Sequence, residues 1–160
     1  MKKIIPLLIV TSFIVLSGCT NEDNNSLTSS KRTTPPVYDK IDVDMSTMNE
    51  TKLSLTYDSF CADPGYYKNK VVKVKGPFEP SESTDENYCF PAIYLFSDAT
   101  GCCPYVLEFY LYNVPVCSMA GGNGYPLYHE EATIVGTFER YYEDGTLFFH
   151  LVDALWLKDQ

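Results

Sequence analysis

Positive charge is scarce in the second half of this 160-residue sequence. From Gly76 to Gln160 there are thirteen acidic side chains and only two basic ones, Arg140 and Lys158. The whole chain carries a formal net charge of −9, and a surface of that sign repels a phosphate backbone. We therefore expect no nucleic acid among the partners of this protein.

The sequence also lacks the short motifs of several enzyme classes. It has no Gly-x-Ser-x-Gly, and its glycine-rich stretch at 121–124 is not followed by the Lys-Ser or Lys-Thr of a phosphate-binding loop. Histidine is limited to His129 and His150, and no Cys-x-x-Cys or His-x-x-x-His spacing occurs. These absences favour a protein that is not an enzyme, and they make the signal for a metal site a weak one.

Aromatic and apolar residues, by contrast, are plentiful. Hydrophobic residues make up 45% of the chain and aromatic residues 14%, with thirteen tyrosines and nine phenylalanines. The first figure is typical of a globular protein, and the second favours β-strands over a helical bundle. The length is that of a single domain.

The N-terminus has the pattern of an export signal. Two lysines precede an apolar run over 4–16, which is too short to cross a bilayer as a helix of about 20 residues. The run ends in Leu-Ser-Gly-Cys at 16–19, which resembles the lipobox of bacterial lipoproteins. This resemblance implies that residues 1–18 are a signal peptide and that Cys19 is lipidated. An ordinary signal peptide followed by an accidental cysteine is the alternative.

A tether and one folded domain are expected after the signal. Residues 20–36 are rich in Asn, Ser, Thr and charge, and such a segment cannot bury enough apolar surface to fold. We therefore expect residues 19–36 to be the lipidated cysteine with a flexible tether, and residues 37–160 to be the domain. The protein would be lipid-anchored in the cell envelope, in the cell membrane or the outer membrane. Glu22 and Asp23 loosely resemble acidic surface-export signals of some bacteria with two membranes.

A short helix is expected at the start of the domain. Thr47-x-x-Glu50 has the spacing of a capping box and predicts a helix over 48–61. Asp-Pro-Gly at 63–65 is expected to end it. Its apolar contacts are expected to come from Met48, Leu53, Leu55 and Phe60.

From residue 70 the sequence alternates apolar and polar residues, as half-buried strands do. Strands are expected over 70–78, 88–97, 105–112, 132–138 and 146–156. The last two are joined by Glu-Asp-Gly at 143–145, and Asp-Gly between alternating runs is typical of a β-hairpin.

Two of these segments share a glycine at the same place. The first and the fourth both read apolar-x-apolar-x-Gly-x-Phe, which puts Gly76 and Gly136 on the apolar side. An inward-facing glycine indicates a bulge or a sharp bend, although two ordinary strands with coincidental glycines would read alike. Five strands with two bends predict a mainly β protein, a small five-stranded OB-like barrel preceded by a short helix. The connection over 113–130 is expected to be a loop, where that fold usually has a helix.

The cysteines are the most informative reactive residues. Five remain if Cys19 carries lipid, so they cannot all pair within one chain. Cys102 and Cys103 are adjacent in an expected turn over 98–104, where two thiols can face the same side. Thiolates there could bind Zn²⁺ or Cu⁺. The other metal ligands would come from Asp98, Cys89, Cys117, His129 or His150. Of these residues, Cys89 and Cys117 are also possible disulfide partners.

The sequence is also compatible with other states of the cysteine pair. Both thiols could be buried as small apolar side chains. One could form a disulfide with Cys89 or Cys117, as is common in exported domains. The two could form a strained vicinal disulfide with each other. A thiol nucleophile with a histidine as its base is a further alternative.

The residues around the pair read Asp-Ala-Thr-Gly-Cys-Cys at 98–103, with Glu-Phe at 108–109. The segment resembles the Asp-Ala-Thr-x-Cys-Cys-x-x-Gly-x-Glu-Phe motif of small bacterial lipoproteins whose function is uncharacterised. The Pro-x-x-Tyr-x-Gly-Lys part of their Pro-x-x-Tyr-x-Gly-Lys-x-Val motif corresponds to 64–70, and the Gly-x-Phe part of their Val-x-Gly-x-Phe strand to 136–138. Asn69 replaces the glycine of the first motif, and Val106 replaces the glycine after the cysteine pair.

This resemblance covers most of the folded part and implies an OB-like domain. A similar Cys-Cys element is found in the C-terminal OB-like domain of proteins that accompany predicted membrane permeases. By analogy, that association suggests metal or solute handling.

These features together predict a membrane-anchored, non-enzymatic binding lipoprotein of the cell envelope, with Cys102, Cys103 and Asp98 as a site for Zn or Cu. The alternative is a structural or protein-interaction lipoprotein whose cysteines are disulfides or buried thiols, and a thiol enzyme is the third hypothesis. A protein or a small molecule would be the partner. The tyrosine pairs at 66–67 and 141–142 could line a ligand groove or pack at strand ends.

Overall fold

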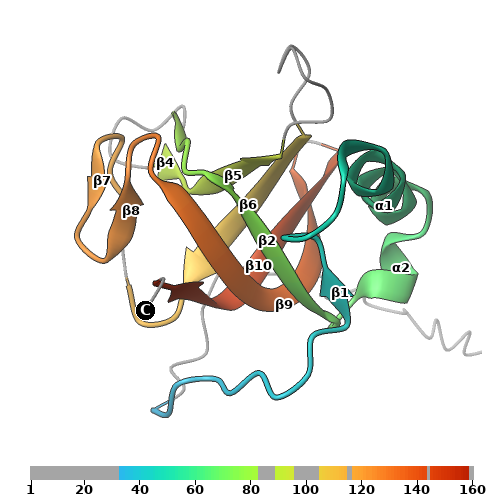
Figure 1. Cartoon of the computed structure of the whole chain (residues 1–160), viewed down its shortest axis with the longest axis horizontal. Helices are drawn as coiled ribbons and strands as arrows, with labels where there is room; N and C mark the ends of the chain where they lie inside the picture. Colours follow the sequence, from blue (N-terminus) through green and yellow to red (C-terminus); the bar gives the residue numbers. More distant parts are fainter. Residues whose placement is uncertain (1–32, 83–88, 96–104, 115–116, 144, 159–160) are drawn as a thin grey trace, which may run out of the picture. The chain divides into compact units, whose positions relative to one another are not determined.

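The computed structural model describes residues 33–82, 89–95, 105–114, 117–143 and 145–158 (Figure 1). The helices are α1 (Glu50–Ala62) and α2 (Pro64–Tyr67). The longer strands are β2 (Val71–Pro77), β5 (Ala92–Leu95), β6 (Tyr105–Leu111), β9 (Glu131–Glu143) and β10 (Thr146–Leu157). The shorter strands are β1 (Val43–Asp44), β3 (Ser81–Glu82), β4 (Cys89–Phe90), β7 (Gly121–Gly122) and β8 (Tyr125–Leu127). The prediction of a mainly β protein with a short preceding helix is confirmed.

The longer strands belong to one sheet in the order β1-β2-β9-β10-β6-β5. Its pairs are antiparallel except β1 with β2 and β6 with β10, which are parallel. The sheet curls, so that Phe78, directly after β2, forms an antiparallel bridge with Ile93 of β5 (Figure 1). The backbone N–H of Glu79 also donates to the carbonyl of Ala92, over 3.0 Å. Strands from the two sides of the curled sheet therefore meet at this bridge.

The expected strand over 88–97 is divided by a proline. Pro91 has no N–H to give to a neighbouring strand, and it separates β4 from β5. β4 pairs with β3, whereas β5 pairs with β6. The expected loop over 113–130 contains the small hairpin β7–β8 instead, in which Gly121, Gly122 and Gly124 have positive φ. The expected hairpin at 143–145 is confirmed, because β9 and β10 pair up to Glu143 and Thr146.

The N-cap of α1 lies two residues later than the sequence predicts. Asn49, not Thr47, is the N-cap, and its side chain accepts a hydrogen bond from the N–H of Lys52 over 3.0 Å. Asparagine is among the best N-cap residues, so it takes precedence over the capping box. Of the expected apolar contacts, Leu53 and Phe60 are buried and Met48 packs against the core, but Leu55 is exposed. Asp63 ends α1 and caps α2 by accepting a hydrogen bond from Tyr66.

The core lies on the concave side of the curled sheet, and α1 covers one end of it. The ring of Phe60 lies 4.7 Å from those of Phe138 and Tyr67, centroid to centroid. Alternate residues of β6 and β10, Phe109 and Leu151 among them, face the same core. The intervening residues of these strands consequently face outward.

The two inward glycines are required by close packing. A Cβ at Gly136 would lie 2.9 Å from the Cβ of Leu151 and 3.1 Å from that of Ala154. Opposite this glycine the register of β10 shifts between Val152 and Leu155, and Asp153 has a φ of 50°. The bend expected at Gly136 is therefore formed by the partner strand. A Cβ at Gly76 would meet the backbone carbonyl of Tyr94.

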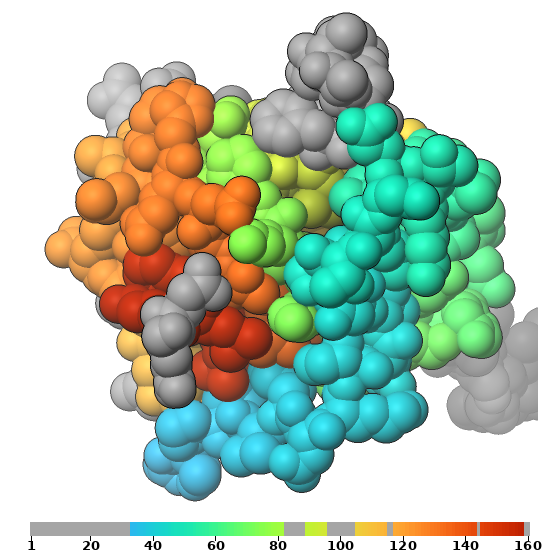
Figure 2. Space-filling view, in the orientation of Figure 1, coloured from blue at the N-terminus to red at the C-terminus, as the bar shows by residue number. Residues whose placement is uncertain are grey.

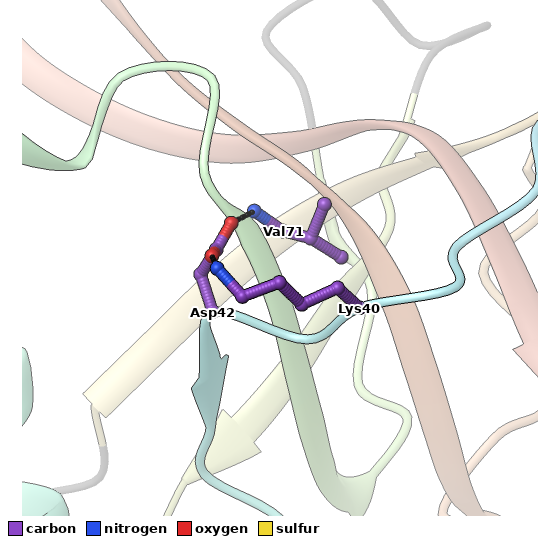
Figure 3. Close-up of polar contacts among 3 residues, drawn as sticks. All are labelled: Lys40, Asp42 and Val71. Atoms are coloured by element: carbon purple, nitrogen blue, oxygen red, sulfur yellow. Dashed lines mark hydrogen bonds and ion pairs between the residues drawn. The ribbon is translucent and has the colours of Figure 1, made fainter.

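The segment before α1 is held along the sheet by polar contacts. The Asp42 carboxylate accepts hydrogen bonds from the N–H of Val71, over 3.1 Å, and from the Lys40 ammonium, over 2.6 Å (Figure 3). The bond from Lys40 and then the one from Val71 lower the pKa of Asp42. The Tyr38 hydroxyl donates to the carbonyl of Asp153 over 2.9 Å. Figure 2 shows this blue segment lying against the red end of the chain.

Neither helix among the described residues has the length and apolar character needed to cross a membrane.

Candidate functional site

The predicted metal ligands Asp98, Cys102 and Cys103 lie outside the described residues, as does the lipidation residue Cys19. The flanks of the cysteine pair are described. β5 ends at Leu95, β6 begins at Tyr105, and these two residues are register partners in an antiparallel pair. The stretch over 96–104 therefore connects two neighbouring strands, as the sequence predicts for the cysteine-bearing connection.

Cys89 and Cys117 form a disulfide with each other. Their Cα atoms are 5.9 Å apart, and both residues are buried. This differs from the expectation that one of them pairs with Cys102 or Cys103. Cys89 lies in β4, and Cys117 lies 28 residues later, before β7, so no local sequence pattern indicates the pairing. In the disulfide form neither sulfur is a thiolate ligand.

Cys61 is the free cysteine among the described residues, near the end of α1. Its side chain is exposed, yet partial burial and then the neighbouring Asp58 carboxylate raise the pKa of its thiol. A raised pKa keeps a thiol protonated, and the protonated form is a poor nucleophile and a poor metal ligand. Nothing in this environment activates Cys61.

The start of β6 is fixed by contacts with α1. The Tyr105 ring stacks on that of Tyr57 with centroids 4.4 Å apart, and its hydroxyl lies 3.1 Å from that of Ser54. The Tyr57 hydroxyl donates to the carbonyl of Val106 over 2.7 Å. Burial raises the pKa of Tyr57 to about 12, so this phenol is a hydrogen-bond donor at neutral pH. The residue that directly follows the cysteine-bearing connection is thus firmly held.

The two histidines predicted as metal ligands lie in different surroundings. His129 is exposed and lies in the turn between β8 and β9. Its Nδ1 is 3.0 Å from the Glu79 carboxylate. His150 is buried in the middle of β10 and only 4% exposed. Among the described residues, no group of three or more His, Cys, Asp or Glu side chains has an arrangement that would hold a metal ion. The described part of the predicted ligand set is therefore not assembled.

His150 instead belongs to a cluster on the outer face of the sheet. Its register partners are Glu139 on β9 and Glu108 on β6, so a histidine lies between two carboxylates across three strands. We call the set formed by these three residues with Tyr110 and Tyr141 the outer-face cluster. The alternating pattern alone puts Glu108 and Tyr110 on one face of β6. Sequence reasoning missed the cluster because no local signal indicates the register in which β6 pairs with β10.

Aromatic rings enclose the imidazole of His150. The ring of Tyr141 stacks on it with centroids 4.9 Å apart, and the ring of Tyr110 meets it edge-on at 5.5 Å. The hydroxyl of Tyr141 donates to the Glu108 carboxylate over 2.8 Å. Tyr141 also stacks on Phe148 at 5.4 Å. Of the tyrosines at 141–142, Tyr141 packs against these rings, while Tyr142 is exposed.

Burial dominates the electrostatics of the cluster. It lowers the pKa of His150 to about 4, so the imidazole is neutral at neutral pH. It raises the pKa of Glu108, against the opposing effect of the hydrogen bond from Tyr141. The pKa of Tyr141 is raised by burial and by the Glu108 carboxylate, and its phenol stays protonated. His150 Nδ1 has no hydrogen-bond partner, and its Nε2 lies 3.8 Å from the Glu139 carboxylate.

A separate cleft of about 310 Å³ lies where β9 begins and β10 ends. It is lined by Glu130, Glu131, Thr133, Trp156, Leu157 and Lys158. The Lys158 ammonium lies 4.4 Å from the centroid of the Trp156 ring, and Glu131 is paired with Lys75. Glu130 and Glu131 are exposed, in keeping with the solvated acidic rim that the sequence suggests. Because its charged groups already have partners, this cleft is a weaker candidate site than the outer-face cluster.

Comparison with known proteins identifies no matching family model, no similar curated protein and no similar solved structure.

Proposed function

We propose that this protein is a non-enzymatic, lipid-anchored binding module of the cell envelope that holds a thiophilic metal ion, Zn²⁺ or Cu⁺, at Cys102 and Cys103. The observation that carries the proposal is the cysteine pairing among the described residues. Cys89 is bonded to Cys117 and Cys61 is free, so no described cysteine is a disulfide partner for either member of the pair. The pair is left as thiols, as ligands or as a disulfide with each other.

The same disulfide supports the proposed location. Disulfides persist in oxidising compartments outside the cytoplasm and are rare inside it. A buried disulfide therefore agrees with a chain that is exported through residues 1–18 and anchored at Cys19. Two or more acyl chains at that cysteine would make the membrane attachment stable.

We further propose that the curled sheet is a five-stranded OB-like barrel. Support comes from the order of its long strands, β2-β9-β10-β6-β5, and from the Phe78–Ile93 bridge between the first and the last of them. The parallel pairing of β6 with β10 is what an OB-like order requires of its third and fifth strands. In this assignment α1, which precedes the barrel, closes the end where Phe60 packs.

The ligand set proposed for the metal is narrower than the set that the sequence allows. Asp98 is the proposed third ligand or the hydrogen-bond partner that orients the thiolates. Among the described residues, Cys89 and Cys117 are engaged in their disulfide and His150 is enclosed by rings. The ring of His129 is exposed, and its Nδ1 lies beside the Glu79 carboxylate. Histidine ligands at metal sites are commonly oriented by a carboxylate in this way. His129 is the remaining imidazole candidate.

Metal analysis of the full-length protein, extracted in mild detergent under reducing conditions, tests the proposal. We expect one equivalent of Zn or Cu per chain, lost in Cys102→Ser and in Cys103→Ser. Cys61→Ser is the matched control, because it removes a thiol that is free and exposed, and it should keep the metal. The absence of stoichiometric metal, or an equal loss in Cys61→Ser, would overturn the assignment.

The alternative of a structural or protein-interaction lipoprotein is favoured by the buried Cys89–Cys117 disulfide itself. Thiol titration after denaturation with a chelator separates the metal-binding form from the form in which the adjacent cysteines make a second disulfide, and the metal analysis above separates it from buried thiols. With Cys19 lipidated and one disulfide formed, three thiols should react, those of Cys61, Cys102 and Cys103. Only Cys61 would react if the adjacent cysteines were bonded to each other.

A further inference from the structure

The outer-face cluster contains a buried acceptor that no described residue satisfies. His150 is 4% exposed, and its Nδ1 is buried with no hydrogen-bond partner. Because burial lowers its pKa to about 4, the imidazole carries one proton at neutral pH. With that proton on Nε2, the atom 3.8 Å from Glu139, Nδ1 is a bare acceptor. Buried acceptors are nearly always paired, so this one calls for a donor.

The carboxylates beside His150 have no lysine or arginine partner among the residues that the structure describes. Glu108 accepts one hydrogen bond, from the Tyr141 hydroxyl over 2.8 Å. No ion pair between described residues joins it to a lysine or an arginine. Glu139 has only the neutral imidazole of His150 within ion-pair distance among these pairs. Burial raises the pKa of Glu108, and a positive charge placed beside the carboxylate would lower it.

The rings of the cluster suit the same kind of partner. Tyr141 and Tyr110 lie on two sides of the imidazole, with centroids 4.9 Å and 5.5 Å away. Aromatic faces attract ammonium and guanidinium groups, and more so where water is excluded. Carboxylates and a neutral acceptor complete a set of groups that all favour a positively charged hydrogen-bond donor.

We propose that the outer-face cluster is a binding site for an organic cation that carries N–H donors, an ammonium or a guanidinium group. Its N–H groups donate to the Glu108 and Glu139 carboxylates and to Nδ1 of His150, and its charge lies against the tyrosine rings. Glu139, whose side chain is 39% exposed, marks the entry from solvent. Binding includes a rotation of Tyr110 or Tyr141 that uncovers Nδ1. An anion would be repelled by the two carboxylates.

This site is independent of the proposed metal site. It uses residues of β6, β9 and β10 and none of the cysteines. The charge of the chain supports it, because the thirteen acids and two bases after Gly76 attract cations to this half of the molecule. This long-range attraction acts on any cation, so the experiment has to distinguish binding at the outer-face cluster from attraction by the overall negative charge.

The probe is agmatine, which carries a guanidinium and an ammonium group, titrated into the full-length protein by calorimetry. At about pH 7 and about 150 mM salt, distant surface charges are screened. We expect saturable binding of one agmatine per chain. Hexamethonium, a bis-quaternary diammonium, carries the same two positive charges but no N–H donor, and we expect it to bind about tenfold more weakly or worse.

Variants locate the binding. Glu108→Gln keeps the size of the side chain and its bond from Tyr141 while removing the charge, and it should weaken agmatine about tenfold or more. His150→Phe, which removes the acceptor, should weaken it in the same direction. Glu131→Gln is the matched control, an exposed carboxylate on the same strand paired with Lys75, and it should bind as the unchanged protein does. Cys102→Ser should also bind normally, which separates this test from that of the metal.

No saturable binding up to about 10 mM agmatine would overturn the proposal, since weaker affinities are below what two charge-assisted bonds supply. Equal weakening by Glu108→Gln and Glu131→Gln would overturn it too, because it would show attraction by the overall negative charge. Thermal unfolding of each variant establishes that the fold is kept. If His150→Phe does not fold, Glu108→Gln alone decides the outcome.

Discussion

Two ionisable groups on one face of the sheet, the buried His150 and the half-buried Glu108, share a preference for their neutral forms. Burial moves the pKa of the imidazole down to about 4 and the pKa of the carboxyl group up. Their effects on stability against pH therefore have opposite signs, and substitution of one residue at a time separates them. The local chemistry of the outer-face cluster can thus be tested without any ligand.

Lowering the pH is expected to destabilise the protein through His150. Its pKa is about 4 in the folded protein, against about 6.5 in an unfolded chain, so between these values the unfolded state binds more protons. This contribution is complete above about pH 6.5 and is lost as the pH falls toward 4. Between pH 7 and pH 4, the free energy of unfolding measured in urea should fall by about 3 kcal/mol less in His150→Phe than in the unchanged protein.

Glu108→Gln gives the control of opposite sign. A carboxyl group whose folded pKa is raised contributes stability at low pH that is lost as the pH rises through that pKa. Removing it should make the rise of stability with pH steeper. Identical pH profiles for His150→Phe and the unchanged protein would contradict the burial of a neutral imidazole.

At the scale of secondary structure, close approaches between strands decide where glycine is needed. Gly136 faces the register shift of β10, and Gly76 faces the backbone of β5. Both lie on the concave face of the sheet, where neighbouring strands leave no room for a Cβ. The hydrogen bonds of Tyr38 with β10 and of Asp42 with β2 hold the segment before α1 against these strands.

Gly136→Ala should destabilise the fold by about 1–3 kcal/mol, the usual cost of forcing an extra methyl group into a packed core. Its Cβ would lie 2.9 Å from that of Leu151, and strand backbone would have to move. Gly65→Ala is the matched control, because its nearest neighbour is 3.6 Å from the added Cβ and lies on a side chain. Urea unfolding measures both. Equal stabilities of the two variants would contradict the close packing at Gly136.

The disulfide is the other constraint between elements, since it joins β4 to the segment before β7. Its two cysteines are 28 residues apart, and closing a loop of that length is expected to contribute about 3–4 kcal/mol. The double variant Cys89→Ser, Cys117→Ser should lose that much stability in urea unfolding. Cys61→Ser should lose little. An unchanged midpoint in the double variant would contradict the pairing.

Sequence pattern predicted what depends on neighbouring residues. The alternation in β6 and β9, the Asp-Gly hairpin and the two inward glycines follow from local spacing. The helix cap failed because Asn49 outcompetes the capping box at Thr47, and the strand over 88–97 failed at Pro91. The Cys89–Cys117 bond joins distant segments and could not be predicted. The expected OB-like order implies that β6 pairs with β10 but not in which register, so the cluster around His150 could not be predicted either.

At the scale of the whole molecule, we propose a curled β domain on a lipid tether, with two chemically different binding sites. The cysteine pair follows β5 and is bounded by Tyr105, which α1 holds in place. The outer-face cluster lies farther along β6, where it pairs with β10. A soft-metal site and a site for an organic cation would let one small domain bind two unrelated ligands.

The tether is tested by removing its proposed lipid acceptor. Cys19→Ala should leave the protein without acyl chains, so it should move from the detergent phase to the aqueous phase on phase partitioning. Two buried acyl chains make the membrane attachment stable, and we propose no other attachment that would replace them. Cys61→Ser should partition as the unchanged protein does. Retention of Cys19→Ala in the detergent phase would contradict the lipid anchor.

The most direct measurement of the central claim is the intact mass of the full-length protein, recorded under native conditions after purification without oxygen. The account predicts the mass of the chain plus one Zn or Cu ion, with the ion lost in Cys102→Ser and kept in Cys61→Ser. A metal-free chain whose mass is lower by the hydrogens of a second disulfide would contradict it, because the adjacent sulfurs would then be bonded to each other.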